Sequence, residues 1–162
     1  MYRRILVPVD GSGPSDKALA VAIRLAKEQH AALRLVHVVD VLPPAGLDGT
    51  AFIDFDTYRD SMLAAGREII KRAETRARAA RVSAEGKLLE TLAHDVSEAL
   101  VDHAKRWRAD LITIGTHGRT GLARVFLGSV AEGVIRHAPV AVLLVRTGEA
   151  RQKPRVRPGR NS

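Results

Sequence analysis

The residues best suited to bind a ligand are glycines and a serine that follow an apolar run at residues 111–114. They are Gly115, Gly118, Gly121, Gly128 and Ser129. Glycine allows the backbone to approach phosphate closely, and the N–H groups at the start of a helix carry partial positive charge. We therefore predict that this loop holds the phosphates of a nucleotide. The alternative is that the glycines only form a turn.

Two common phosphate-binding motifs are absent from the sequence. No glycine is followed by Lys-Ser or Lys-Thr, as the P-loop requires, and the pair Gly11 and Gly13 lacks the third glycine of the dinucleotide motif. The spacing that is present is Gly115-x2-Gly118-x9-Gly128-Ser129.

Apolar runs that alternate with helical periodicity predict the elements that position this loop. The expected strands lie at residues 4–9, 33–39, 84–91, 111–114 and 140–145, and residues 84–91 have the weakest strand pattern. The expected helices lie at residues 16–30, 57–80, 95–107 and 129–137. Strands that alternate with helices form a parallel sheet covered on both faces. The expected fold is therefore α/β, with an open, doubly wound, five-stranded parallel sheet and helices on both faces.

In such sheets, ligands bind beyond the carboxyl ends of the strands, where the strand order reverses. Asp10 follows the first expected strand, Val38 and Val39 end the second, and Gly115 ends the fourth. We expect these positions to converge on one crevice. Pro8 conflicts with a central position of the first strand, because proline has no N–H to donate to a neighbouring strand. The conflict disappears if no carbonyl of a neighbouring strand lies opposite its nitrogen.

The glycine spacing resembles the motif of the ATP-binding subclass of the universal stress protein family. The resemblance covers residues 1–146 and rests on five segments in matching order, which are ILVPVDGS, HVVD, DLITIGTHGRTG, LGSV and APVAVLLVR. It implies a Rossmann-like fold of the adenine nucleotide alpha hydrolase type, with strand order 3-2-1-4-5. It also implies that the ligand is ATP, accompanied by Mg²⁺ or Mn²⁺.

The resemblance also implies roles for individual residues. Asp10 would lie near the ribose and the metal–phosphate region and be the candidate metal ligand, and Val38 would pack on adenine. Gly115 and Gly118 would give the backbone room beside the ribose and phosphates. Phosphate oxygens would be bound at the start of a helix. The residues there are Gly128, Ser129 and Val130.

Three further residues complete the candidate binding set. They are Pro8 and Val9, which precede Asp10, and Arg119 in the glycine loop. Arg119 either contacts phosphates or points to solvent, and Asp10 has the alternative of a turn-forming residue that caps the next loop. Asp10 would repel a triphosphate directly, so beside phosphate it requires a metal ion or a sugar hydroxyl. No catalytic residue is assigned, because Ser129 has no evident His–carboxylate pair.

One segment departs from the family pattern. Family members often carry a glycine–proline turn after the third strand, where this chain has Thr91, Leu92, Ala93 and His94. We expect these bulkier side chains to narrow the adenine side of the pocket.

These observations favour a nucleotide-binding stress-response module in which ATP sets a conformation or the choice of partner. The family implies a homodimer that pairs through residues 140–145, which would cover an apolar edge strand. The alternatives are a weak ATPase or autokinase, and an interaction scaffold of the same fold that binds no nucleotide. A phosphorelay receiver is disfavoured, because Thr91 and Arg146 stand where an acceptor Asp and a Lys are expected.

Composition limits the remaining possibilities. The chain has 162 residues, a net charge of +8 and no cysteine, which excludes a thiol nucleophile and thiolate metal sites. Residues 147–162 have five basic residues against Glu149 and are expected to be a disordered tail, for which nucleic-acid binding is not expected. The apolar runs are too short for a transmembrane helix, and Pro8 and Asp10 interrupt any signal-peptide core. A cytoplasmic location is the expectation.

Overall fold

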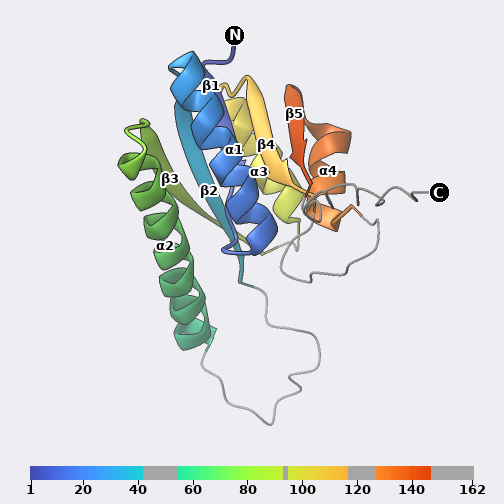
Figure 1. Cartoon of the computed structure of the whole chain (residues 1–162). Coiled ribbons are helices and arrows are strands. Elements are labelled where there is room, and N and C mark those ends of the chain that lie inside the picture. Colours follow the sequence, from blue (N-terminus) through green and yellow to red (C-terminus); the bar gives the residue numbers. More distant parts are fainter. Residues whose placement is uncertain (42–54, 93–94, 117–126, 147–162) are drawn as a thin grey trace, which may run out of the picture.

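The structure is a computed structural model that describes residues 1–41, 55–92, 95–116 and 127–146 (Figure 1). Strands and helices alternate along the chain, as predicted. The elements are β1 (Arg4–Pro8), α1 (Gly13–Gln29), β2 (Ala32–Asp40), α2 (Phe55–Ala79), β3 (Ala84–Thr91), α3 (Val96–Trp107), β4 (Leu111–Gly115), α4 (Ser129–His137) and β5 (Ala141–Val145). The predicted tail at residues 147–162 lies outside the described residues.

The five strands form one parallel sheet with the order β3-β2-β1-β4-β5, which confirms the predicted fold class and strand order. The strand order reverses at β1, because β2 lies on one side of it and β4 on the other. The carboxyl ends of these two neighbours therefore define the position where a doubly wound sheet binds its ligands. At the edge of the sheet lies β5, and pairing of β5 with a second copy stays a prediction.

Pro8 fits into β1 because its missing N–H falls where the ladder has already ended. The N–H of Val9 donates to the carbonyl of Val36 in β2 at 2.8 Å, so the nitrogen of Pro8 faces the opposite neighbour, β4. The registered pairs between β1 and β4 stop at Leu6 and Ile112. The proline therefore removes no ladder hydrogen bond, and β1 and β4 are free to separate at their carboxyl ends.

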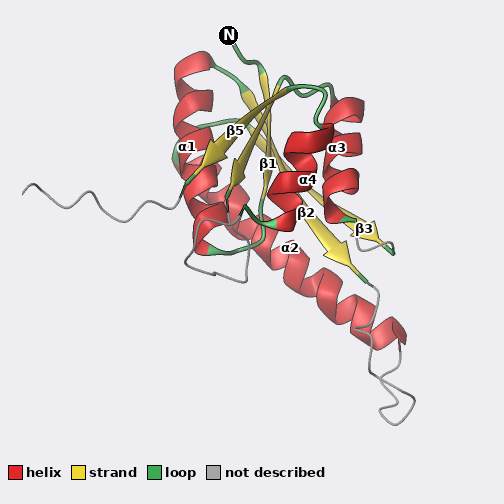
Figure 2. Cartoon of the chain, turned by 90° about the vertical axis from the view of Figure 1, so that its right-hand side faces the viewer, coloured by secondary structure: helices red, strands yellow, loops and turns green. Residues whose placement is uncertain are grey.

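Helices cover both faces of the sheet, with α1 and α2 on one side and α3 and α4 on the other (Figure 2). Successive side chains of β1 point to opposite faces. Ile5 and Val7 belong to the core beneath α1 and α2, whereas Leu6 packs in the core with Leu100 of α3 and Val134 of α4. Continuous apolar strands are therefore buried on both sides, as a parallel sheet requires. No helix in the described ranges is long and apolar enough to cross a membrane.

The start of α3 is capped by a carboxylate whose titration should influence stability. Oδ1 of Asp95 accepts the N–H of Glu98 at 2.8 Å and the hydroxyl of Ser97 at 2.8 Å. The hydrogen bond from the Glu98 backbone, followed by that from Ser97, holds the pKa of Asp95 below its usual value. A carboxyl whose pKa is lowered by folding stabilises the fold above its unfolded pKa, and this stabilisation is lost as the pH falls through the folded value.

We therefore expect Asp95→Asn to lose less stability than the wild type when the pH falls from 7 to below about 4, the range of unperturbed Asp. Asparagine caps a helix as well as aspartate but does not titrate. Urea unfolding of both proteins at pH 7 and pH 3 measures the difference. Equal losses in the two proteins would show that the carboxylate of Asp95 does not contribute to the acid sensitivity.

Candidate functional site

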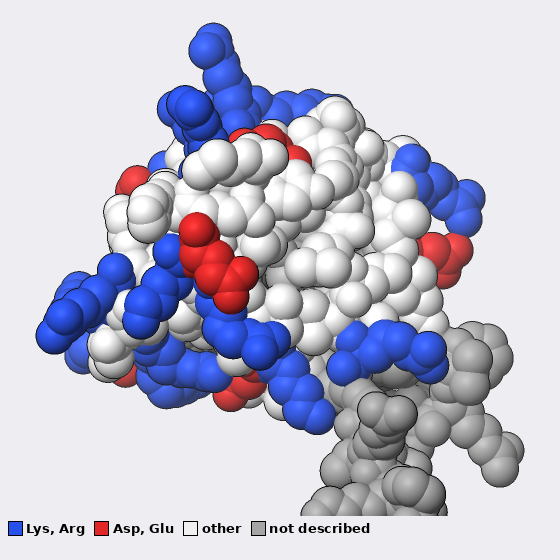
Figure 3. Space-filling view, turned by 45° about the horizontal axis from the view of Figure 1, so that its top comes forward, with Lys and Arg blue, Asp and Glu red and all other residues white. Residues whose placement is uncertain are grey.

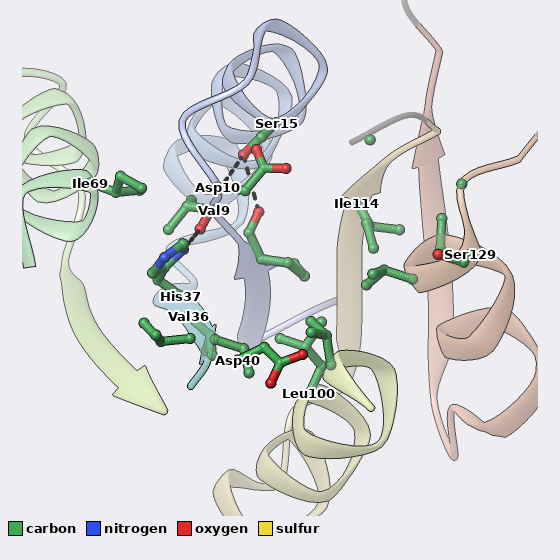
Figure 4. Close-up of a pocket in the computed structure, with 18 of the residues that line it drawn as sticks. Val9, Asp10, Ser15, Val36, His37, Asp40, Ile69, Leu100, Ile114 and Ser129 are labelled. Carbon is green, nitrogen blue, oxygen red and sulfur yellow. Dashed lines mark hydrogen bonds between the residues drawn. The ribbon is translucent and has the colours of Figure 1, made fainter. Parts of the chain in front are cut away.

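A cavity of about 440 Å³ lies at the carboxyl ends of β1, β2 and β4. Its walls come from the β1–α1 turn, the end of β2, α2, the first half of α3 and the start of α4. Figure 4 shows Ile69 of α2 and Ser129 of α4 on opposite sides of this cavity, with Asp10 between them. The separation of β1 from β4 beyond Leu6 therefore opens onto a ligand-sized space.

The predicted site residues that the structure describes all line this cavity. They are Pro8, Val9, Asp10, Val38, Gly115, Gly128, Ser129 and Val130. Gly118 and Arg119 lie outside the described residues. The structure thus brings segments more than a hundred residues apart in sequence to one place, while the contacts of each residue with a ligand stay predictions.

One side of the cavity is an apolar slot between the sheet and the α3–α4 layer. Val36 and Val38 of β2 and Ile114 of β4 contribute the sheet side, and Val96 and Leu100 of α3 face them. A planar, apolar ring system fits such a slot. Sequence reasoning identified Val38 but missed the others. Alternation from Val38 would have indicated Val36, since residues i and i+2 of a strand share a face.

The β1–α1 turn holds Asp10 at the edge of the cavity. Oδ1 of Asp10 accepts the N–H of Ser12 at 2.9 Å, and the N–H of Asp10 donates to Oγ of Ser15 at 3.2 Å. Gly11 between them has φ +76°, a conformation that favours glycine. Asp10 is therefore a turn-forming residue, as the alternative reading held, and it also lines the cavity.

The start of α4 lies at the cavity. Gly128 is the N-cap, and no side chain in the described part of the chain caps this end. The N–H of Gly128 donates to the carbonyl of Thr116 at 2.9 Å, which fixes the start of α4 against the end of β4. The next residues, Ser129 and Val130, line the cavity. The first N–H groups of a helix have no partner within the helix, so this end suits an anion.

Gly115 has a packing role that the sequence did not reveal. A Cβ atom at this position would lie 2.8 Å from the carbonyl oxygen of Pro14 and 2.9 Å from its carbonyl carbon. Only glycine therefore allows the start of α1 to lie against the end of β4 without a backbone shift. This contact is independent of the predicted role beside a ribose.

A second side of the cavity comes from α2, which sequence reasoning did not include. Met62, Ala65 and Ile69 line it, together with His37 and Asp40 of β2. Nδ1 of the buried His37 donates to the carbonyl of Val9 at 2.6 Å, which links the ends of β1 and β2. His37 is thus a hydrogen-bonded strand residue. The helical pattern of α2 could not indicate from the sequence which turn of this helix lies beside the strand ends.

The segment that departs from the family pattern lies beside the end of β2. The carbonyl of Thr91 accepts the N–H of Val41 at 3.0 Å, and Leu92 is 64% exposed. Neither residue lines the cavity, so these two side chains do not provide the expected narrowing. Ala93 and His94 lie outside the described residues.

A doubly wound sheet with an apolar slot and an uncapped helix start at its switch point defines an α/β protein of the small-ligand-binding class. Residues 1–146 match the universal stress protein family, and the chain belongs to that family. This result confirms the family that the sequence motifs indicated.

Three relatives are similar over nearly the whole chain. Universal stress protein MJ0531 of Methanocaldococcus jannaschii is 36% identical over 146 residues, which are 90% of this chain and 83% of that protein. A crystal structure of a universal stress protein in complex with cAMP is 26% identical, with a TM-score of 0.65, covering 91% of this chain and 98% of that chain. The universal stress protein of Archaeoglobus fulgidus in complex with dAMP is 25% identical, with a TM-score of 0.66, covering 88% and 97%.

Proposed function

We propose that this chain binds an adenine nucleotide, that ATP is its ligand, and that nucleotide binding regulates its part in a stress response. The cavity carries the proposal, because it joins an apolar slot to the uncapped start of α4 beside Asp10. Structures of two relatives with nearly complete coverage contain the adenine nucleotides cAMP and dAMP. These relatives support an adenine nucleotide, and the choice of ATP rests on the glycine motif.

The apolar slot would take the adenine ring. A dissociation constant near 1 µM corresponds to about 8 kcal/mol of binding free energy. The dipole of one helix start provides only about 0.3–1 kcal/mol for an anion at an exposed site. The dipole alone therefore cannot supply such an affinity, and burial of the base against Val38, Leu100 and their neighbours would add to the hydrogen bonds of the phosphates.

The start of α4 would take the phosphates. Gly128 allows close approach, and Ser129 offers both its backbone N–H and its hydroxyl. Hydrogen bonds to charged oxygens are about twice as strong as those between neutral groups. The terminal phosphates of ATP would extend from here toward the glycine loop that contains Gly118 and Arg119.

Asp10 would act toward the phosphates through a divalent cation. Within the described ranges, no cluster of three or more His, Asp or Glu side chains could hold a metal ion. Mg²⁺ in nucleotide sites is typically held by one or two carboxylates together with phosphate oxygens and water. Oδ1 of Asp10 already accepts from Ser12, so its second oxygen is the atom that would bind the metal ion.

The identity of the bound nucleotide tests this function directly. Freshly purified protein is denatured, and any released compound is identified by chromatography, followed by calorimetric titration with ATP and AMP. We expect an adenine nucleotide to be released and ATP to bind with a 1:1 stoichiometry. Removal of divalent cations should weaken the binding of ATP more than the binding of AMP. A protein that releases no nucleotide and gives no binding heat with either compound would overturn the proposal.

A further inference from the structure

A second cavity, of about 590 Å³, lies at the amino-terminal ends of β1, β2 and β3, opposite the candidate nucleotide site. We call it the arginine cavity. Its lining residues are Arg4, Ala32, Leu33, Ser83, Ala84, Glu85, Arg106, Trp107 and Arg108. Three of these side chains are guanidinium groups, and one is a carboxylate. The charge of this cavity is thus strongly one-sided.

The carboxylate of Glu85 does not neutralise the arginines on α3. Arg34 binds it in a two-pronged ion pair, with Nη1 3.0 Å from Oε1 and Nη2 3.0 Å from Oε2. In the part of the chain that the structure describes, the side chains of Arg106 and Arg108 have neither a hydrogen bond nor an ion pair. No carboxylate among the described residues therefore neutralises these two exposed guanidinium groups.

Trp107 helps to hold two guanidinium groups near the cavity, those of Arg4 and Arg34. The guanidinium carbon of Arg34 lies 5.0 Å from the ring centroid of Trp107, and that of Arg4 lies 6.0 Å from it, both within cation–π range. Nη1 of Arg4 also donates to the carbonyl of Trp107 at 3.0 Å. This bond matters because the carbonyls at the end of α3 would otherwise repel an anion.

Basic side chains occupy strained backbone positions at the same edge of the sheet. Three described non-glycine residues have positive φ, which are His30 at 55°, Arg81 at 59° and Arg108 at 56°. All three lie in turns that lead from a helix to the next strand. Glycine or asparagine usually fills such positions, since the conformation costs other residues about 1–2 kcal/mol. Figure 3, which brings this end forward, shows Lys and Arg side chains around it.

The buried His103 is subject to the same positive field. It lies on α3 one turn before Arg106 and Trp107, and its Nε2 has no hydrogen-bond partner among the residues that the structure describes. Burial lowers the pKa of His103, and the positive charges of Arg34, Arg106 and Lys87 lower it further. Burial is the main cause of this lowered pKa, and the nearby cations act in the same direction.

We propose that the arginine cavity is a second ligand site, which binds a compact anion rich in phosphate, such as inorganic triphosphate. The planar fork of arginine matches the oxygens of phosphate with two parallel hydrogen bonds. The volume lies in the range of small-molecule pockets. Complementing the helix dipole would explain Arg106 in the last turn of α3 and the bond from Arg4 to the carbonyl of Trp107, but it does not explain why Arg108 occupies a left-handed position that favours glycine.

Trp107 provides a direct test because it is the single tryptophan of the chain. Its fluorescence is followed while the full-length protein is titrated with inorganic triphosphate. We expect a saturable change that is weakened at least tenfold in Arg106→Gln/Arg108→Gln. Arg106→Lys/Arg108→Lys keeps the charges but loses the planar guanidinium groups. Its affinity for triphosphate should lie between that of this variant and that of the wild type. Thermal unfolding verifies that each variant is folded.

The matched control is Arg24→Gln/Arg67→Gln, which removes the same charge from exposed positions on α1 and α2. We expect it to bind triphosphate as the wild type does. An absent fluorescence change, or equal weakening in this control, would overturn the proposal. A saturable fluorescence change with a single-stranded oligonucleotide but not with triphosphate would overturn the proposal in favour of a nucleic-acid surface. Ser129→Asp, at the other end of the sheet, should leave the titration unchanged, which separates this site from the proposed nucleotide site.

Discussion

Gly115→Ala is expected to destabilise the protein by about 1–3 kcal/mol, the usual effect of forcing one extra carbon into a packed interior. The new Cβ would lie 2.8 Å from the carbonyl oxygen of Pro14, and a backbone atom cannot rotate away as a side chain can. Relief requires the start of α1 and the end of β4 to move apart. Urea unfolding measures the change in the free energy of unfolding.

Gly13→Ala is the matched control for this substitution. A Cβ at Gly13, the first residue of α1, would meet no atom within 4 Å. Because alanine also restricts the unfolded chain more than glycine does, we expect stability to be unchanged or raised by up to about 1 kcal/mol. Equal destabilisation by both substitutions would show that the contact with Pro14 does not explain the need for glycine at position 115.

Gly115 is expected to influence nucleotide binding as well as stability. Gly115 lines the cavity, and so does Asp10 in the turn that leads to α1. A shift between α1 and β4 would therefore also weaken nucleotide binding, without any contact between the new methyl group and the ligand. The motif at this position combines packing of the scaffold with access to the cavity, whereas its last residues, Gly128 and Ser129, form the start of α4, where we propose that the phosphates bind.

The fold was predictable because its central strands are buried on both sides and its helices are amphipathic. The expected strand at residues 84–91 had the weakest pattern, and the structure shows why. It is the edge strand β3, where Gly86 packs against Ile70 of α2 while Glu85 and Lys87 are exposed. An edge strand covered mainly on one face lacks the continuous apolar run of a central strand. The order of the strands came from the family resemblance and not from periodicity.

The candidate site was predictable only where it is built from strand ends and loops. Parallel strands bring their carboxyl ends to one edge, so Asp10, Val38 and Gly115 could be placed together from the sequence. The helical wall could not be placed in this way. Leu100 has the spacing of an ordinary core residue, and its position beside the cavity depends on how α3 packs against β2 and α4.

Ser129→Asp is expected to weaken ATP binding at least 100-fold, or about 2.7 kcal/mol, without destabilising the protein. Ser129 is the first residue of α4, where a carboxylate is favourable to the helix by about 0.3–1 kcal/mol. The same carboxylate would repel phosphate oxygens placed at this helix start. The free energies of folding and of binding should therefore change in opposite directions.

Two comparisons locate the phosphates with this variant. Adenosine has no phosphate for the new carboxylate to repel. Its affinities for Ser129→Asp and for the wild type should therefore differ by less than about threefold. Ser129→Ala removes the hydroxyl but keeps the backbone N–H groups. It should therefore lower the affinity for ATP no more than about tenfold, which is the effect of losing one charge-assisted hydrogen bond. Calorimetric titration of the wild type and both variants measures these affinities. If ATP binds Ser129→Asp as tightly as the wild type, its phosphates do not lie at the start of α4, and the proposed orientation of the nucleotide is wrong.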